Sequence, residues 1–148
     1  MARQVRGLLE VDGEPGVYAV EVRRYECQRC RAVMTVVPAG MLACRQYSAS
    51  SIALTLYLWL VVGLSDRSVR SRVCAWRRRG RNDRGWAQLY RWARDAATLF
   101  SLPRARMAEE PVHELARRVL SMLRSLSPVA LSAAPIAVQI FEGAALTR

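Results

Sequence analysis

QYSASSIALTLYLWLVVGLS, residues 46–65, is the stretch that decides the fold, because it carries no charged side chain over a length that could just span a bilayer. Its first third is polar or small, however. Only Ile52–Leu64 is continuously apolar apart from Thr55, and that run is too short for a membrane span. We therefore expect a helix that is buried on all sides at the centre of a small bundle. A small protein anchored in a membrane by residues 46–65, with arginines on both sides, is the alternative.

Serine and glycine mark the ends of this helix and the start of the next one. Ser48 or Ser50 can accept a hydrogen bond from the first turn, and Gly63 is suited to end the helix. Ser65 is placed to cap a second helix, which we expect over residues 66–77.

A third helix is predicted over Gly85–Phe100, after a polar loop. Its apolar side chains recur at helical spacing and form an inner face of Trp86, Leu89, Tyr90, Ala93, Ala97 and Phe100. Its outer face carries Arg84, Gln88, Arg91 and Arg94. A fourth helix is predicted from the apolar face formed by Val112, Leu115, Ala116, Val119, Leu120 and Leu123. Short terminal helices are expected to begin at Pro128 and Pro135.

The residues before the buried helix have the pattern of strands. Val5–Val11 and Val17–Tyr25 are joined by residues 12–16, whose Asp-Gly and Pro-Gly steps are typical of a hairpin turn. Val33–Val37 gives a third run of the same kind. We expect a three-stranded ribbon, which is too small to be stable without a neighbour or a staple.

The chain therefore belongs to the α+β class, with a small N-terminal β-ribbon followed by a mainly helical, helix-turn-helix-like bundle. We expect the ribbon over residues 1–44, the helix-turn-helix-like unit over 45–102 and a helical tail over 103–148. The opening residues lack the apolar run of a signal peptide, so a cytoplasmic location is expected.

Charge is concentrated in one part of the chain. The formal net charge is +11, and all 23 basic residues are arginine. Residues 65–95 carry ten arginines against three aspartates, a balance of +7. A GC-rich genome or a solvated charged face would also enrich arginine. Because tryptophan and tyrosine alternate with these arginines, we expect a surface that binds nucleic acid.

A pair of cysteines, Cys27 and Cys30, follows a predicted strand as in a zinc knuckle. A closed structural zinc site needs four ligands, usually from two such knuckles. The sequence offers one knuckle, since Cys44 and Cys74 have no paired partner and His113 is expected on the surface. We therefore hypothesise that Cys27 and Cys30 bind a zinc cofactor, in a site that this chain leaves incomplete.

The same segment resembles a known family. Residues 22–30, VRRYECQRC, and 34–38, MTVVP, resemble the second half of the zinc ribbon of bacterial insertion-sequence transposases. Tyr47-Ser48, Gly63-Leu64-Ser65 and Gly85-Trp86 with Arg91-Trp92-Ala93 extend the similarity, which covers residues 5–100. The resemblance implies a protein that binds transposon-end DNA and acts as a transposition accessory or regulator.

The sequence departs from this family in two ways. The first zinc knuckle is missing, which a misplaced start or a decayed ribbon would explain. Full-length transposases also carry an acidic triad on an RNase-H-like domain, whereas Glu109, Glu110 and Glu114 lie on a predicted helix without strands. We therefore expect no enzymatic activity. A non-functional remnant of a mobile element is the alternative to a DNA-binding protein.

The expected DNA contacts follow from the helix-turn-helix hypothesis. The third helix would enter the major groove, and the residues predicted to read base edges are Arg84, Gln88 and Arg91. Those predicted to hold the phosphate backbone are Arg77, Arg78, Arg79 and Arg81. Arg94 continues the DNA-binding face, and Arg67, Arg70 and Arg72 of the second helix are expected to be available to phosphates. The expected partners are double-stranded DNA and, as a homo-oligomer, the chain itself.

Overall fold

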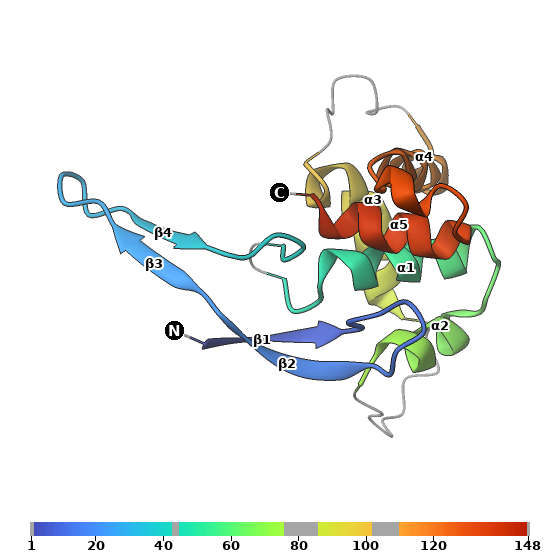
Figure 1. Ribbon diagram of the computed structural model, residues 1–148, viewed down its shortest axis with the longest axis horizontal. Coiled ribbons are helices and arrows are strands. Elements are labelled where there is room, and N and C mark those ends of the chain that lie inside the picture. The colour runs from blue at the N-terminus through green and yellow to red at the C-terminus, as the bar shows by residue number, and fades with distance from the viewer. Residues whose placement is uncertain (1, 43–44, 76–85, 102–109, 148) are drawn as a thin grey trace.

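The computed structural model describes residues 2–42, 45–75, 86–101 and 110–147 of the chain. Over these ranges, two antiparallel β-hairpins are followed by five α-helices, so the protein has the α+β fold that the sequence predicts. Figure 1 shows the helices gathered into one bundle and the strands extending away from it.

Helix α1 (Ala49–Leu60) confirms the predicted central buried helix. It packs against α2, α3, α4 and α5, which explains why it is apolar on all sides. Ser48 caps it, because the backbone N–H of Ser51 donates to Ser48 Oγ at 3.2 Å. Gly63, with a φ of 80°, follows its C-terminal end. Where the structure describes the chain, each helix falls short of the length and apolar character needed to cross a bilayer.

Helix α2 (Asp66–Val73) is short and buries Val69 and Val73. Its predicted cap is confirmed, since Ser65 Oγ accepts a hydrogen bond from the Ser68 N–H at 3.2 Å. The helix ends at Val73 and not near residue 77, because Cys74 already has an extended backbone.

Helix α3 (Ala87–Leu99) buries a face that is rotated slightly from the predicted one. Leu89, Ala93, Ala97 and Phe100 are buried as expected. The prediction for Tyr90 is wrong, since its side chain is 52% exposed, whereas Trp92 is 2% exposed. Residues 89, 92, 93 and 96 follow one helical stripe, and this stripe leaves residue 90 at the margin.

Helices α4 (Val112–Ser125) and α5 (Ile136–Ala145) complete the bundle. The predicted apolar face of α4 is buried at Ala116, Val119, Leu120 and Leu123. Pro128 precedes a 3-10 helix over Val129–Leu131, and Pro135 directly precedes α5. Side chains of α4 and α5 enter the same hydrophobic cluster as those of α1 and α3, so the helices predicted as a tail contribute to the main core.

Helices α4 and α5 come into backbone contact at Gly143. A Cβ atom at this position would overlap the carbonyl oxygen of Leu123. Nearby, the buried Gln139 accepts a hydrogen bond from Arg124 Nε at 2.8 Å and donates to the carbonyl oxygen of Ala134 at 2.7 Å. A glycine and a buried amide therefore set the distance between the two helices.

The strands form two separate ribbons, which corrects the predicted three-stranded one. The first pairs β1 with β2 and the second pairs β3 with β4, over Ala2–Gly7, Gly16–Glu21, Arg23–Glu26 and Val33–Val36 respectively. The sequence predicted one long strand over residues 17–25. That strand is interrupted at Val22, whose side chain is 2% exposed between the two ribbons. The residues after Val22 thus leave the first sheet, and β4 pairs only with β3.

The first ribbon is attached to the start of α1. The N–H of Arg6 donates to the carbonyl oxygen of Gln46 at 2.6 Å, and the N–H of Leu8 donates to Ser51 Oγ at 2.8 Å. The side chain of Leu8 packs in a small cluster with Leu54, Val73 and Phe141. The base of the ribbon is therefore held by α1, α2 and α5.

Candidate nucleic-acid interface

An aromatic cluster fixes the position of α3 beside the start of α1. Tyr47 makes edge contacts with Trp86 and Trp92, with ring centroids 6.2 and 5.1 Å apart, and the two tryptophans lie 5.2 Å from each other. The Tyr47 hydroxyl donates to Cys74 Sγ at 3.3 Å, and burial raises the pKa of Tyr47. Trp86 and Trp92 are thus packing residues rather than exposed platforms for bases.

The N-terminal ends of α2 and α3 meet. The backbone N–H of Trp86, which precedes α3, donates to Asp66 Oδ2 in the first turn of α2 at 3.1 Å. Residues 74–86 connect the two helices, so the connection is longer than the tight turn of the simplest helix-turn-helix. The Asp66 carboxylate occupies the positive end of the α3 dipole, where a phosphate would otherwise be favoured. Contacts with an anionic ligand are therefore expected from arginine side chains of α2 and α3 rather than from the N-terminal end of α3.

The exposed side of α3 carries three of the predicted DNA-binding residues. Gln88 is half-buried, whereas Arg91 and Arg94 are exposed. Arg94 Nε lies 3.4 Å from Asp95 Oδ1, and Asp95 also lies 3.7 Å from an Arg45 nitrogen. The Arg91 guanidinium forms no hydrogen bond or ion pair with any residue that the structure describes. Among the described arginines of α3, Arg91 is therefore free to bind a phosphate or a base.

The arginines of α2 have different roles. Arg67 is exposed and Arg70 is half-buried, and the expectation that they reach a phosphate stays a prediction. For Arg72 that expectation is wrong. Its two terminal nitrogens donate to the carbonyl oxygens of Gly13 and Val11 at 2.7 and 2.6 Å. Arg72 thus holds the β1–β2 turn against α2.

The remaining predicted DNA-binding residues, four for the phosphate backbone and Arg84 for base edges, belong to one segment of the chain. Arg77, Arg78, Arg79, Arg81 and Arg84 all fall in the segment 76–85, outside the residues that the structure describes. The described candidates for DNA contact are therefore Arg67 of α2 and Gln88 and Arg91 of α3, and the bond between Asp66 and Trp86 joins the N-terminal ends of these two helices.

The cysteine pair lies in the turn between β3 and β4, and both side chains are exposed. The N–H of Arg31 donates to the carbonyl oxygen of Cys27 at 2.8 Å, and the N–H of Cys27 donates to that of Ala32 at 2.8 Å. The turn requires a left-handed backbone at Arg31, with a φ of 60°. Hydrogen bonds from Cys30 and Arg29 lower the pKa of the Cys27 thiol, which favours the thiolate.

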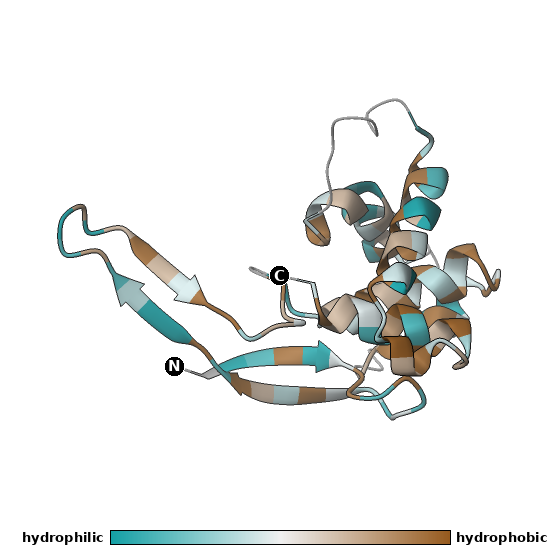
Figure 2. Ribbon diagram, turned by 45° about the horizontal axis from the view of Figure 1, so that its top comes forward, coloured by the Kyte–Doolittle hydropathy of each residue, from teal (hydrophilic) through white to brown (hydrophobic). Residues whose placement is uncertain are grey.

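The β3–β4 ribbon also carries arginines that the sequence did not single out for binding. Arg23, Arg24 and Arg29 are exposed, and no described residue forms a hydrogen bond or ion pair with their guanidinium groups. Figure 2 shows β3 as hydrophilic and β4 as more hydrophobic, although neither strand is buried. Their position in the sequence could have identified them, since Arg23 and Arg24 precede the cysteine pair and Arg29 lies between the two cysteines.

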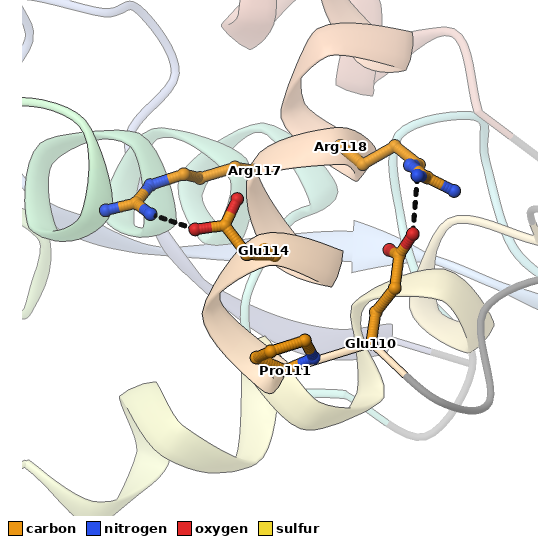
Figure 3. Close-up of a pocket in the computed structure, with 5 residues that line it drawn as sticks. All are labelled: Glu110, Pro111, Glu114, Arg117 and Arg118. Carbon is orange, nitrogen blue, oxygen red and sulfur yellow. Dashed lines mark hydrogen bonds and ion pairs between the residues drawn. The ribbon is translucent and has the colours of Figure 1, made fainter.

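The described surface also has a shallow pocket at the start of α4 (Figure 3). Arg117 bonds Glu114 at 2.5 Å and donates to the carbonyl oxygen of Leu60 at 3.2 Å, while Arg118 pairs with Glu110. The charges in this pocket are therefore matched within the protein and attach α4 to the end of α1. The described residues contain no group of three or more His, Cys, Asp or Glu side chains arranged to hold a metal ion.

His113 lies close by on the surface of α4, as predicted from the sequence. Its ring contacts Trp59 edge-on, with centroids 5.1 Å apart, and Trp59 in turn contacts Tyr90 at 4.9 Å. These three rings join α1, α3 and α4 at the edge of the core.

Comparisons of the chain with protein-family models, with curated proteins and with solved structures found no match.

Proposed function

We propose that the protein binds double-stranded DNA through the exposed arginines of α2 and α3. The observation that carries this proposal is that Arg67 and Arg91 are exposed on two helices whose N-terminal ends are joined by the bond between Trp86 and Asp66. Neither arginine is paired with a described residue, unlike those of the pocket on α4. Unpaired guanidinium groups on a rigid helical face are suited to phosphate oxygens and to the edges of guanine.

The charge distribution supports the same proposal. Residues 65–95 account for +7 of the net charge of +11, and this segment contains α2 and the first nine residues of α3, 87–95. Such a concentration attracts a polyanion over a distance of several ångströms and makes binding dependent on salt. A small acidic ligand would need fewer charges than residues 65–95 carry.

A role as an accessory or regulator of transposition is the finer part of the proposal. It rests on the resemblance of residues 22–38 to a transposase zinc ribbon, together with the α+β order of ribbon and helices. In this role the bound duplex would be a transposon end, and the chain would act without catalysing strand cleavage.

The test is duplex-DNA binding by the full chain over a series of salt concentrations. We expect log Kd to rise linearly with the logarithm of salt concentration, as counterions are displaced from the phosphates. Arg91→Ala should weaken binding by about 1–3 kcal/mol if Arg91 reads a base, or reduce the salt slope by about 1 if it binds a phosphate.

Arg118→Ala is the matched control, because it removes one positive charge from a residue that is already paired with Glu110 on α4. We expect it to leave DNA affinity nearly unchanged. If Arg91→Ala and Arg118→Ala weakened DNA binding equally, the affinity would depend on the net charge of the chain and not on the position of Arg91. If the wild-type chain bound no duplex at low salt, the DNA-binding proposal would be wrong, and the inert-remnant hypothesis would replace it.

A further inference from the structure

We propose that Cys27 and Cys30 supply half of a four-thiolate zinc site that is completed by the same two cysteines of a second copy of the chain. This inference goes beyond DNA binding and does not depend on it, because it concerns the β3–β4 turn rather than α2 and α3.

The β3–β4 turn presents both cysteines from a closed loop. The bonds from the Arg31 N–H to the Cys27 carbonyl oxygen and from the Cys27 N–H to Ala32 close the loop at its base, each at 2.8 Å. An ion pair of 2.9 Å between Arg31 and Glu26 spans the same turn. The two cysteines thus project from a closed loop, and neither side chain is covered by the protein. Two thiols separated by two residues in such a turn are a typical half-site for zinc.

A zinc ion needs more ligands than Cys27 and Cys30 provide. A structural zinc ion takes four ligands in a tetrahedral arrangement. The described residues hold no cluster of three or more potential ligands, so they do not complete the site around Cys27 and Cys30. Cys74 is half-buried beside Tyr47 and α3, in the body of the protein. A second copy brings the two missing thiolates without any change in the fold.

The β3–β4 turn is accessible to a second copy of the chain. Figures 1 and 2 both show the β3–β4 turn at the far end of the ribbon, away from the helices. Two such turns can therefore meet around one ion while the two helical bundles remain apart. The resulting contact has two-fold symmetry, in which each copy donates the same pair of atoms.

The charges and side chains near the turn also suit a second copy. On coordination, the four thiols release four protons to the buffer, and the zinc tetrathiolate carries a charge of −2. Arg29 of each copy is exposed and adjacent to the cysteines, so the two guanidinium groups can neutralise this charge. Tyr25 and Met34 are paired across the ribbon and are 52% and 65% exposed. A second copy at the turn would shield part of this apolar surface.

The experiment uses the full chain, reduced with a phosphine and freed of metal, and titrates it with zinc chloride. Bound zinc is measured by competition with a chromophoric chelator, and molar mass is measured by light scattering after size-exclusion chromatography. We expect saturation at one zinc per two chains and a doubling of the mass from 16.7 kDa, both reversed by excess chelator. Cobalt in place of zinc should give the absorption spectrum of a tetrahedral site with four thiolates.

Variants locate the ligands. Cys27→Ser and Cys30→Ser should each abolish saturation at one zinc per two chains and remain at the mass of one chain. Cys74→Ser and Cys44→Ser are the controls, and both should bind zinc and dimerise like the wild type. Since Cys27 and Cys30 are exposed, their serine variants should keep the helical circular dichroism spectrum and DNA affinity per chain. Saturation at one zinc per chain, zinc-dependent dimerisation of Cys27→Ser, or no zinc binding would each overturn the proposal.

Discussion

Helix α1 and the β3–β4 ribbon both carry apolar side chains, but only those of the helix are buried. Nine of the twelve residues of α1 are buried, whereas all eight residues of the two strands are exposed. Burial of α1 by four other helices supplies the hydrophobic free energy that stabilises the fold. Backbone pairing and one turn hold the ribbon, so its apolar residues contribute little to the stability of a single chain. Tyr25, Met34 and Val36 are therefore available for contacts with another molecule.

The largest effect in this comparison should come from truncating equivalent side chains in the two regions. Leu56 is 0% exposed in α1, and Leu56→Ala should lower the free energy of unfolding by about 2–5 kcal/mol. Met34 is 65% exposed, and Met34→Ala should change it by less than about 0.5 kcal/mol. Urea unfolding followed by far-ultraviolet circular dichroism gives both values under the same conditions. Losses of similar size would mean that the ribbon belongs to the stabilising core.

A second substitution tests how closely the helices of the bundle are packed. Alanine is favoured over glycine within a helix by about 1 kcal/mol, so an exposed position would be stabilised by the exchange. At Gly143 the sign should reverse, because the added Cβ overlaps the Leu123 carbonyl oxygen and α4 and α5 must separate. We expect Gly143→Ala to destabilise the protein by about 1–3 kcal/mol. Thermal unfolding would contradict this packing if the variant melted at a higher temperature than the wild type.

The local features of the bundle could be predicted from the sequence. The caps at Ser48 and Ser65 and the apolar face of α4 depend on residues within a turn or two of each other, and all three are confirmed. The prediction of the inner face of α3 was wrong at Tyr90, and it left out Trp92. Periodicity alone did not decide between Tyr90 and Trp92, because that choice depends on Tyr47 and Trp86, which surround the Trp92 ring.

The features that sequence reasoning missed depend on contacts between distant residues. The interruption at Val22 has no glycine or proline to mark it, since it results from burial of that one side chain. Arg72 resembled the other arginines of α2, but its partners Val11 and Gly13 lie 61 and 59 residues earlier in the chain. The candidate DNA-binding face was predicted from charge and periodicity, which cannot distinguish a free guanidinium group from one that is already bonded.

The third prediction compares Arg72, whose guanidinium group is bonded, with Arg91, whose guanidinium group is free of bonds to the described residues. Arg72→Ala removes two hydrogen bonds from a guanidinium group to backbone carbonyl oxygens and should lower the free energy of unfolding by about 1–2 kcal/mol. Arg91→Ala should change it by less than about 0.5 kcal/mol, because no described residue is bonded to its side chain. Urea unfolding of the two variants decides the matter. If Arg91→Ala were the more destabilising, Arg91 would be a structural residue and a poor candidate for DNA contact.

The smallest effect is expected in the β3–β4 turn, where Arg31 has a left-handed backbone with a φ of 60°. A side chain with a Cβ costs about 1–2 kcal/mol in this conformation, and glycine avoids that cost while losing slightly more entropy on folding. Arg31→Gly and Arg31→Ala both lose the exposed ion pair with Glu26, so their difference isolates the backbone term. We expect the turn to be more stable by about 1 kcal/mol in the glycine variant, which corresponds to roughly fivefold slower exchange of the Cys27 amide hydrogen. That amide reports on the turn because it is bonded to Ala32. Equal exchange rates in the two variants would show that residue 31 keeps its left-handed conformation when the turn opens. The closed loop that presents the two cysteines would then depend on its hydrogen bonds alone.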